Sequence, residues 1–281
     1  MKGTNVSLPG DLAEALRSCG LAARRGVHVV EVGGSSVQST MLGPDGGVQF
    51  LDGPQAGADG EVFGLTAPGL VIDGRVWGAT QLGWDDVAAW RELGYRRPPD
   101  VSMNDAEAAA LGEWLLREER PSSLLYAGIG TGLGGALVVD GVTVPSFDLS
   151  HRTGFGDGVC HGCRRRGCLN AQVGGEYLPA RLSTADGRRV VELLATAIEG
   201  AGVPAGTVVV FAGGLVRRTR PELVAALRER LRGVFPVVGS AAPEAAKSAA
   251  YAGVFLRLAE ARRPTTDRDH PASSSSTARP E

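Results

Sequence analysis

The sequence lacks an excess of charge of either sign and contains almost no lysine. Its 281 residues include 29 basic and 31 acidic side chains, for a formal net charge of −2. This balance argues against a protein that binds nucleic acid by neutralising many phosphates. Lys2 and Lys247 are the only lysines, and all other cationic residues are arginines. Because alanine and glycine are also abundant, we attribute this preference to codon bias rather than to function.

Long apolar segments are missing as well. The N-terminal residues contain no apolar stretch between a basic end and a cleavage site, so no signal peptide is expected. Residues 121–139 carry no charge, but their five glycines predict two strands around a loop rather than a membrane helix. We therefore expect a cytoplasmic protein that does not act at a membrane.

Cysteine is too scarce for a disulfide scaffold, and its distribution is uneven. Three of the four cysteines lie within nine residues, which favours metal binding in a reducing compartment. The candidate ligands are His151, Cys160, His161, Cys163 and Cys168. Thiolates and imidazoles suit tetrahedral zinc, and four of them fill its coordination shell. The sequence therefore predicts a structural metal with no open position.

Glycine is abundant, at 41 residues, about twice its usual share. Two segments about 97 residues apart each read as strand, glycine loop and strand: 27–42 around Gly33-Gly34-Ser35, and 123–144 around Gly130-Thr131-Gly132. This weak repeat predicts two similar domains whose glycine loops face a shared cleft. The second loop matches G-x-G-x-x-G, but a strand follows it, which excludes a dinucleotide-binding fold. Backbone N–H groups and the Thr131 hydroxyl could still bind phosphate; a glycine-rich hairpin without a ligand is the alternative.

The remaining pattern predicts the domain organisation. We expect helices at 11–25, 85–93, 105–118, 185–199, 221–232 and 243–260, strands at 100–103 and 207–211, and a hairpin at 71–77. The expected parts are an N-terminal leader (1–26), a small α/β domain with the first phosphate loop (27–105), a large α/β domain with the second loop and the metal segment (106–242), a C-terminal helix packing back on the small domain (243–262) and a disordered tail (263–281).

Two strand ends carry further candidates, each with a structural alternative. Asn104-Asp105 lies where a strand passes into a helix, so the pair could cap the helix, or the aspartate could accept a proton from an attacking hydroxyl. Gly213-Gly214 follows the buried strand 207–211 and could allow close approach of adenine. An ordinary turn at the strand exit would explain these glycines equally well.

Together, the segments NDAEAAALGE, GTGLGGALVVDG and the His–Cys cluster ending in GCLN resemble the ROK family, whose name combines repressors, unassigned reading frames and sugar kinases. The resemblance extends from about residue 27 to residue 260. Its most specific part is a histidine followed at +10, +12 and +17 by three cysteines. From His151 these steps reach His161, Cys163 and Cys168, so we expect these four residues to bind zinc, with Cys160 as the alternative to His161.

The resemblance implies an α/β fold of two actin-like, ribonuclease H-like ATPase domains with an interdomain cleft. It also implies a kinase that transfers the γ-phosphoryl group of ATP, with Mg²⁺, to a hydroxyl of a small acceptor, and a homodimer. Asp105 would be the catalytic base, and Gly69, Asn104 and His151 would hold the acceptor. The nucleotide would lie on both glycine loops and the later Gly-Gly pair: Gly33, Gly34, Ser35, Gly130, Thr131, Gly132, Gly213 and Gly214.

Three positions depart from the family pattern. Glu31 stands where the first loop usually follows an aspartate linked to Mg²⁺, while Asp148 and Asn170 replace two glutamates that bind sugar hydroxyls. A shorter carboxylate and a neutral amide should prefer a different hydroxyl or amine pattern. We therefore expect an amino sugar or a C7-cyclitol (carbasugar) as acceptor rather than glucose.

Three alternatives remain. An ordinary glucose or hexose 6-kinase would tolerate these substitutions, and a non-catalytic sugar-binding sensor would explain the altered pocket. A ROK repressor would need a helix-turn-helix domain ahead of the first glycine loop, and we expect too few residues there for one.

Overall fold

The computed structural model describes residues 6–21, 26–43, 47–55, 62–219 and 222–262. The predicted tail and part of the predicted leader helix lie outside these residues; the described part of that helix is α1 (Gly10–Ser18). Within the described ranges, no helix is both long and apolar enough to cross a membrane.

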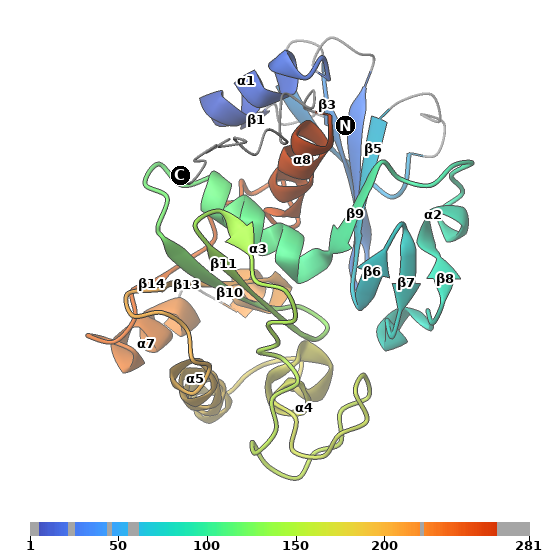
Figure 1. The fold of residues 1–281 in the computed structure, drawn as a ribbon. Helices are drawn as coiled ribbons and strands as arrows, with labels where there is room; N and C mark the ends of the chain where they lie inside the picture. The colour runs from blue at the N-terminus through green and yellow to red at the C-terminus, as the bar shows by residue number, and fades with distance from the viewer. Residues whose placement is uncertain (1–5, 22–25, 44–46, 56–61, 220–221, 263–281) are drawn as a thin grey trace, which may run out of the picture.

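The first half of the chain forms a six-stranded sheet in the order β1-β4-β3-β2-β5-β9 (Figure 1). Strands β1 to β4 pair antiparallel, and β5 and β9 extend the sheet in parallel with β2. Every residue of β2 and β5 is buried, as in strands covered on both faces. The strands are β1 (Val6–Ser7), β2 (Val27–Val32), β3 (Val37–Leu42), β4 (Gly47–Asp52), β5 (Val62–Ala67) and β9 (Val101–Asn104).

The second sheet repeats this plan with five strands in the order β12-β11-β10-β13-β14. An antiparallel hairpin, β10–β11, is again joined to a parallel strand, β13. The predicted repeat of two hairpins around glycine loops is thereby confirmed. The strands are β10 (Ser123–Ile129), β11 (Leu133–Val139), β12 (Val142–Thr143), β13 (Val208–Ala212) and β14 (Val237–Val238).

A small third sheet follows β5 in the chain and contains the predicted hairpin at 71–77. It consists of β6 (Leu70–Ile72), β7 (Arg75–Trp77) and β8 (Val87–Ala88), with the 3-10 helix η1 (Thr80–Leu82) between β7 and β8. The helix predicted at 85–93 is shorter than expected, because residues 87 and 88 pair with β7 instead. Only α2 (Ala89–Glu92) remains helical.

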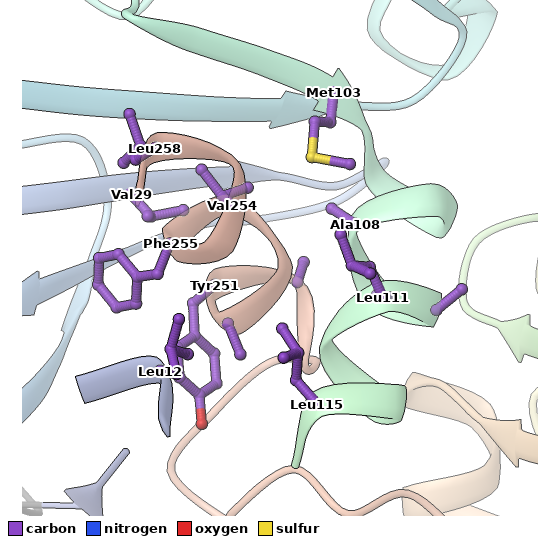
Figure 2. Packing of buried hydrophobic residues seen from close by; sticks show 14 of the residues in the cluster. Leu12, Val29, Met103, Ala108, Leu111, Leu115, Tyr251, Val254, Phe255 and Leu258 are labelled. Carbon is purple, nitrogen blue, oxygen red and sulfur yellow. The ribbon is translucent and has the colours of Figure 1, made fainter. Parts of the chain in front are cut away.

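Two helices, α3 (Asp105–Leu115) and α8 (Ala250–Ala261), pack closely against each other beside the first sheet. Glycines allow this approach, because a Cβ on Gly112 would lie 1.8 Å from the carbonyl oxygen of Ala249. Figure 2 shows Tyr251, Val254 and Phe255 of α8 among apolar side chains from α1, β2 and α3. The packing fixes the start of α3 relative to the first sheet.

The second sheet is covered by α5 (Thr184–Glu199) and α7 (Glu222–Arg230), which share an apolar core with β10 and β13. Both helices lie close to their predicted positions. The short elements α4 (Asn170–Val173), η2 (Gly175–Tyr177) and α6 (Gly214–Thr219) complete this half. The helix predicted from residue 243 begins only at residue 250, because the segment before it is held by side chains of the first sheet.

Candidate active site

The pair Asn104-Asp105 lies where β9 ends and α3 begins. The Asn104 Oδ1 atom accepts hydrogen bonds from the backbone N–H groups of Ala106 (2.9 Å) and Glu107 (3.2 Å), so Asn104 caps the helix. Its Nδ2 donates to the carbonyl oxygen of Gly69 at 2.9 Å. Gly69 has a φ of +86°, and a Cβ there would lie 2.3 Å from the Trp77 carbonyl oxygen. Two predicted acceptor-binding residues are thus held side by side.

Asp105 occupies the first position of α3 and is partly buried. Its Oδ1 accepts a hydrogen bond from the N–H of Ala106 at 2.9 Å. Burial raises the pKa of Asp105 above the usual aspartate value, although this hydrogen bond and the positive charge of Lys247 act against the increase. A carboxylate with a raised pKa is a stronger base than an exposed aspartate.

Glu31, near the end of β2, is the second carboxylate of the site. It is buried, and its Oε1 accepts a hydrogen bond from the Ser248 hydroxyl at 2.7 Å. Burial raises the pKa of Glu31, the Lys247 charge and the Ser248 hydrogen bond lower it, and the negative charge of Asp105 raises it further. Glu31 and Asp105 therefore interact electrostatically with each other and with the same cation.

The two glycine loops, 33–36 and 130–132, approach each other across the two sheets. A Cβ on Gly34 would lie 3.0 Å from Thr131 Oγ1. Gly213 follows β13 with a φ of +99°, and a Cβ on it would lie 2.5 Å from the carbonyl oxygen of Ile129, which immediately precedes the second loop. The structure thus brings together the three segments predicted to bind nucleotide: Gly33, Gly34 and Ser35; Gly130, Thr131 and Gly132; and Gly213 and Gly214.

A group of four possible metal ligands lies in the loop before α4. The ligand atoms of His151, Cys160, Cys163 and Cys168 all lie within 4.8 Å of one another. His151 Nδ1 is 3.3 Å from the sulfur of Cys168 and 3.8 Å from that of Cys160. Three soft thiolates and an imidazole form a donor set that fits tetrahedral zinc.

The structure places Cys160 in this group, in the position expected for His161. The His161 side chain is 70% exposed, and its Nδ1 lies 3.3 Å from Glu176 Oε2. The chain makes a tight turn after Cys160, in which the Arg164 N–H donates to the Cys160 carbonyl oxygen. This turn brings Cys160 and Cys163 to one side, and sequence spacing alone does not show which of two adjacent residues faces inward.

The two residues that depart from the family pattern in the acceptor region have different surroundings. Asp148 is exposed, and its Oδ1 accepts a hydrogen bond from the N–H of His151 at 2.9 Å. Asn170 is 3% exposed; its Oδ1 accepts from the N–H of Leu133 at 2.7 Å and its Nδ2 donates to the Cys160 sulfur at 3.4 Å. The Asn170 amide therefore connects the second glycine loop to the group of possible metal ligands, a role that the sequence did not indicate.

The segment 245–248, just before α8, also reaches the site, and sequence reasoning missed it. Lys247 donates from Nζ to the carbonyl oxygen of Ser36 at 2.8 Å, and the adjacent Ser248 contacts Glu31. Codon bias accounts for the scarcity of lysine but not for the location of this one. Within the ranges that the structure describes, Lys247 is the only lysine. This rarity was the only sequence feature that could have drawn attention to Lys247 as a site residue.

Comparison with known proteins places these features in a family. A family model described as "ROK family" matches residues 48–210, more than half of the chain. Kanosamine kinase from Amycolatopsis mediterranei (strain S699) is 40% identical over 100 residues, which cover 33% of this chain and 32% of that protein. N-acetylmannosamine kinase from Citrobacter koseri (strain ATCC BAA-895 / CDC 4225-83 / SGSC4696) is 31% identical over 29% of this chain and 30% of that protein. The aligned part of the chain thus spans about a third of the length of these relatives.

Solved structures agree in fold over most of the chain. The ROK hexokinase from Thermus thermophilus matches with a TM-score of 0.58 at 22% identity, covering 84% of this chain and 99% of that one. A ROK family glucokinase from Streptomyces griseus, solved with glucose and AMPPNP, matches with a TM-score of 0.62 at 16% identity, covering 84% and 98%. The predicted actin-like α/β fold is therefore confirmed, and the chain belongs to the ROK family.

Proposed function

We propose that this protein is an ATP-dependent kinase that transfers the γ-phosphoryl group to a hydroxyl, expected to be primary, of a sugar or sugar-like acceptor. The observation that carries the proposal is the position of Asp105, a partly buried carboxylate of raised pKa at the start of α3. It follows Asn104, which binds the carbonyl oxygen of Gly69. Asp105 and Glu31 both interact electrostatically with Lys247, which contacts the first glycine loop. The partial similarity to two sugar kinases supports this proposal.

Asp105 would act as the general base. It would accept the proton of the acceptor hydroxyl as that oxygen attacks the γ-phosphorus and ADP leaves. Asn104 caps α3 and holds Gly69, so it would fix the direction of the Asp105 side chain and the wall of the acceptor site. Phosphoryl transfer has a loose transition state, and correct positioning therefore supplies much of the rate enhancement.

The two glycine loops would hold the phosphates with their backbone N–H groups, and Gly213-Gly214 would lie against adenine. Glu31 would hold Mg²⁺, because a carboxylate close to a second carboxylate offers the hard oxygen ligands that this ion prefers. When bound, Mg²⁺ would offset negative charge on the β- and γ-phosphates.

His151, Cys160, Cys163 and Cys168 would hold a structural zinc ion. Zinc there would fix the loop 151–168 and, through Asn170, the start of β11. Because His151 Nδ1 lies within the ligand group, the Nε2 atom would be the ring nitrogen for the acceptor.

For the acceptor we propose an amino sugar or a C7-cyclitol rather than glucose. Asp148 and Asn170 remove the two glutamates of the family pattern, and the 40% identity with a kanosamine kinase over a third of the chain is consistent with an amino sugar. Ordinary hexose phosphorylation is the alternative, since similar folds occur in a hexokinase and a glucokinase.

The test is an ADP-release assay with Mg-ATP and a panel of glucose, mannose, fructose, N-acetylmannosamine, glucosamine, kanosamine and several cyclitols. Acceptor-dependent ADP release, with a phosphorylated product detected by mass spectrometry, is the expected result. Turnover confined to amino sugars or cyclitols would support the proposed specificity, whereas a preference for glucose would contradict it. A protein that binds sugar and ATP without turnover on any acceptor would instead be a sensor.

A further inference from the structure

We propose that Lys247 binds the γ-phosphoryl group of ATP and stabilises its negative charge during transfer, as a catalytic residue supplied by the segment before α8. This inference rests on the proposed kinase function and adds a residue to it. None of the sequence motifs pointed to this residue, and it lies more than 100 residues from Asp105 and 200 from the first glycine loop in the chain.

The Lys247 ammonium group lies directly against the first glycine loop. Its Nζ donates to the carbonyl oxygen of Ser36 at 2.8 Å, and a Cβ on Gly33 would lie 2.1 Å from the same Nζ atom. The ammonium therefore occupies the space that the missing side chain of Gly33 leaves open. A group in this position is next to whatever phosphate the loop holds.

Two carboxylates and a second cation, Arg217, surround the Lys247 ammonium group electrostatically. Glu31 and Asp105 both interact electrostatically with Lys247. A nucleoside triphosphate would bring several more negative charges to the same place. Backbone N–H groups carry only partial charges, so they would offset these charges only in part. An ammonium group has three N–H donors, of which the contact with Ser36 uses one. The others could reach phosphate oxygens without a change in the anchoring of the side chain.

The backbone around Lys247 is fixed from both halves of the molecule. Its N–H donates to Gln38 Oε1 at 2.5 Å, and Gln38 Nε2 donates to the carbonyl oxygen of Ala245 at 3.0 Å. From the second half, Arg217 of α6 donates to the carbonyl oxygen of Ala246 at 2.6 Å. A charge held in this way needs little reorganisation during the reaction, which is the condition for effective electrostatic stabilisation.

Burial lowers the pKa of Lys247, while the charges of Glu31 and Asp105 raise it. The two carboxylates therefore help to keep the side chain protonated. A protonated lysine also contacts the β- and γ-phosphates in P-loop enzymes, which catalyse phosphoryl transfer.

The test compares Lys247→Met and Lys247→Arg with Arg257→Gln, a control ten residues further along the chain whose ion pair with Glu260 lies on α8. Titration calorimetry would measure binding of ADP and of a non-hydrolysable ATP analogue. Lys247→Met should weaken binding of the analogue by about tenfold while changing ADP binding much less. It should also lower kcat by about a hundredfold, with partial recovery in Lys247→Arg and no change in Arg257→Gln.

Other outcomes would overturn the inference. Equal losses for ADP and the analogue, together with a lower melting temperature without nucleotide, would show that Lys247 only holds the loop together. Wild-type binding and turnover in Lys247→Met would exclude any role. The two binding measurements require no acceptor, so they still test Lys247 if the wild-type protein phosphorylates nothing in the panel and the proposed function fails.

Discussion

Replacement of Cys160 by serine should release the proposed zinc ion, whereas replacement of the adjacent His161 by asparagine should not. Ideal zinc bond lengths give ligand separations of about 3.8 Å between two sulfurs and about 3.6 Å between sulfur and nitrogen. His151 Nδ1 lies 3.3 Å from the sulfur of Cys168 and 3.8 Å from that of Cys160. These distances lie on either side of the ideal separation between sulfur and nitrogen. The exposed His161 imidazole contacts Glu176 instead.

The size of the effect follows from the binding energy of structural zinc, about 10–16 kcal/mol in small zinc domains. If four ligands share this energy equally, one thiolate contributes about 3 kcal/mol, which corresponds to a loss of affinity of more than about a hundredfold. The Cys160→Ser change also removes the sulfur that accepts from Asn170, so the start of β11 should loosen.

The assay is zinc content by mass spectrometry after dialysis against a chelator of graded concentration. Wild type and His161→Asn should retain one zinc ion per chain at chelator concentrations that strip Cys160→Ser. Loss of zinc from His161→Asn, with retention in Cys160→Ser, would refute the ligand assignment. Equal retention in all three proteins would refute the metal site itself.

Two further predictions concern Asn170 and His28. Asn170→Glu keeps an acceptor for the Leu133 N–H, gives up the donor to the Cys160 sulfur and adds a carboxylate. We expect kcat/KM for glucose to rise relative to cyclitols and amino sugars, and an unchanged ranking in competition assays would show that Asn170 does not face the acceptor. His28 is fully buried, and burial lowers its pKa from 6.5 to about 4. As the pH falls, the His28 imidazole therefore becomes protonated in the unfolded chain at a higher pH than in the folded protein. The free energy of unfolding, measured with urea, should therefore decrease by about 3 kcal/mol between pH 7 and pH 4. His28→Gln should lose this part of the pH dependence, and an identical slope in the variant would assign it to other groups.

The sequence predicted the elements whose pattern is local. Both glycine hairpins follow from apolar runs broken by glycines, and the start of α3 follows from the capping residue Asn104. The helix expected from residue 243 was wrong in its first turns, because Gln38 binds the backbone of that segment from a distant strand. No local pattern reports such a contact.

The candidate site shows the same difference: residues in local motifs were predicted, and residues placed by long-range contacts were not. Family-like motifs indicated Asp105, the glycine loops and the metal segment. The choice between Cys160 and His161 depended on the geometry of one turn, and the inward position of Lys247 depended on a contact with Ser36, 211 residues away in the chain. Both require the folded structure, since each is a question of side-chain direction rather than of composition.

The most direct test of the account is steady-state phosphoryl transfer by Asp105→Asn beside Glu107→Gln, a control two residues further along α3. Asparagine preserves the size of the side chain and the oxygen that accepts from Ala106, so the fold and the binding of ATP should be unchanged. We expect kcat to fall by about 10²–10⁴-fold in Asp105→Asn, because the proposed general base is lost, and to stay near wild type in Glu107→Gln. Turnover within a few-fold of wild type in Asp105→Asn would contradict the central claim.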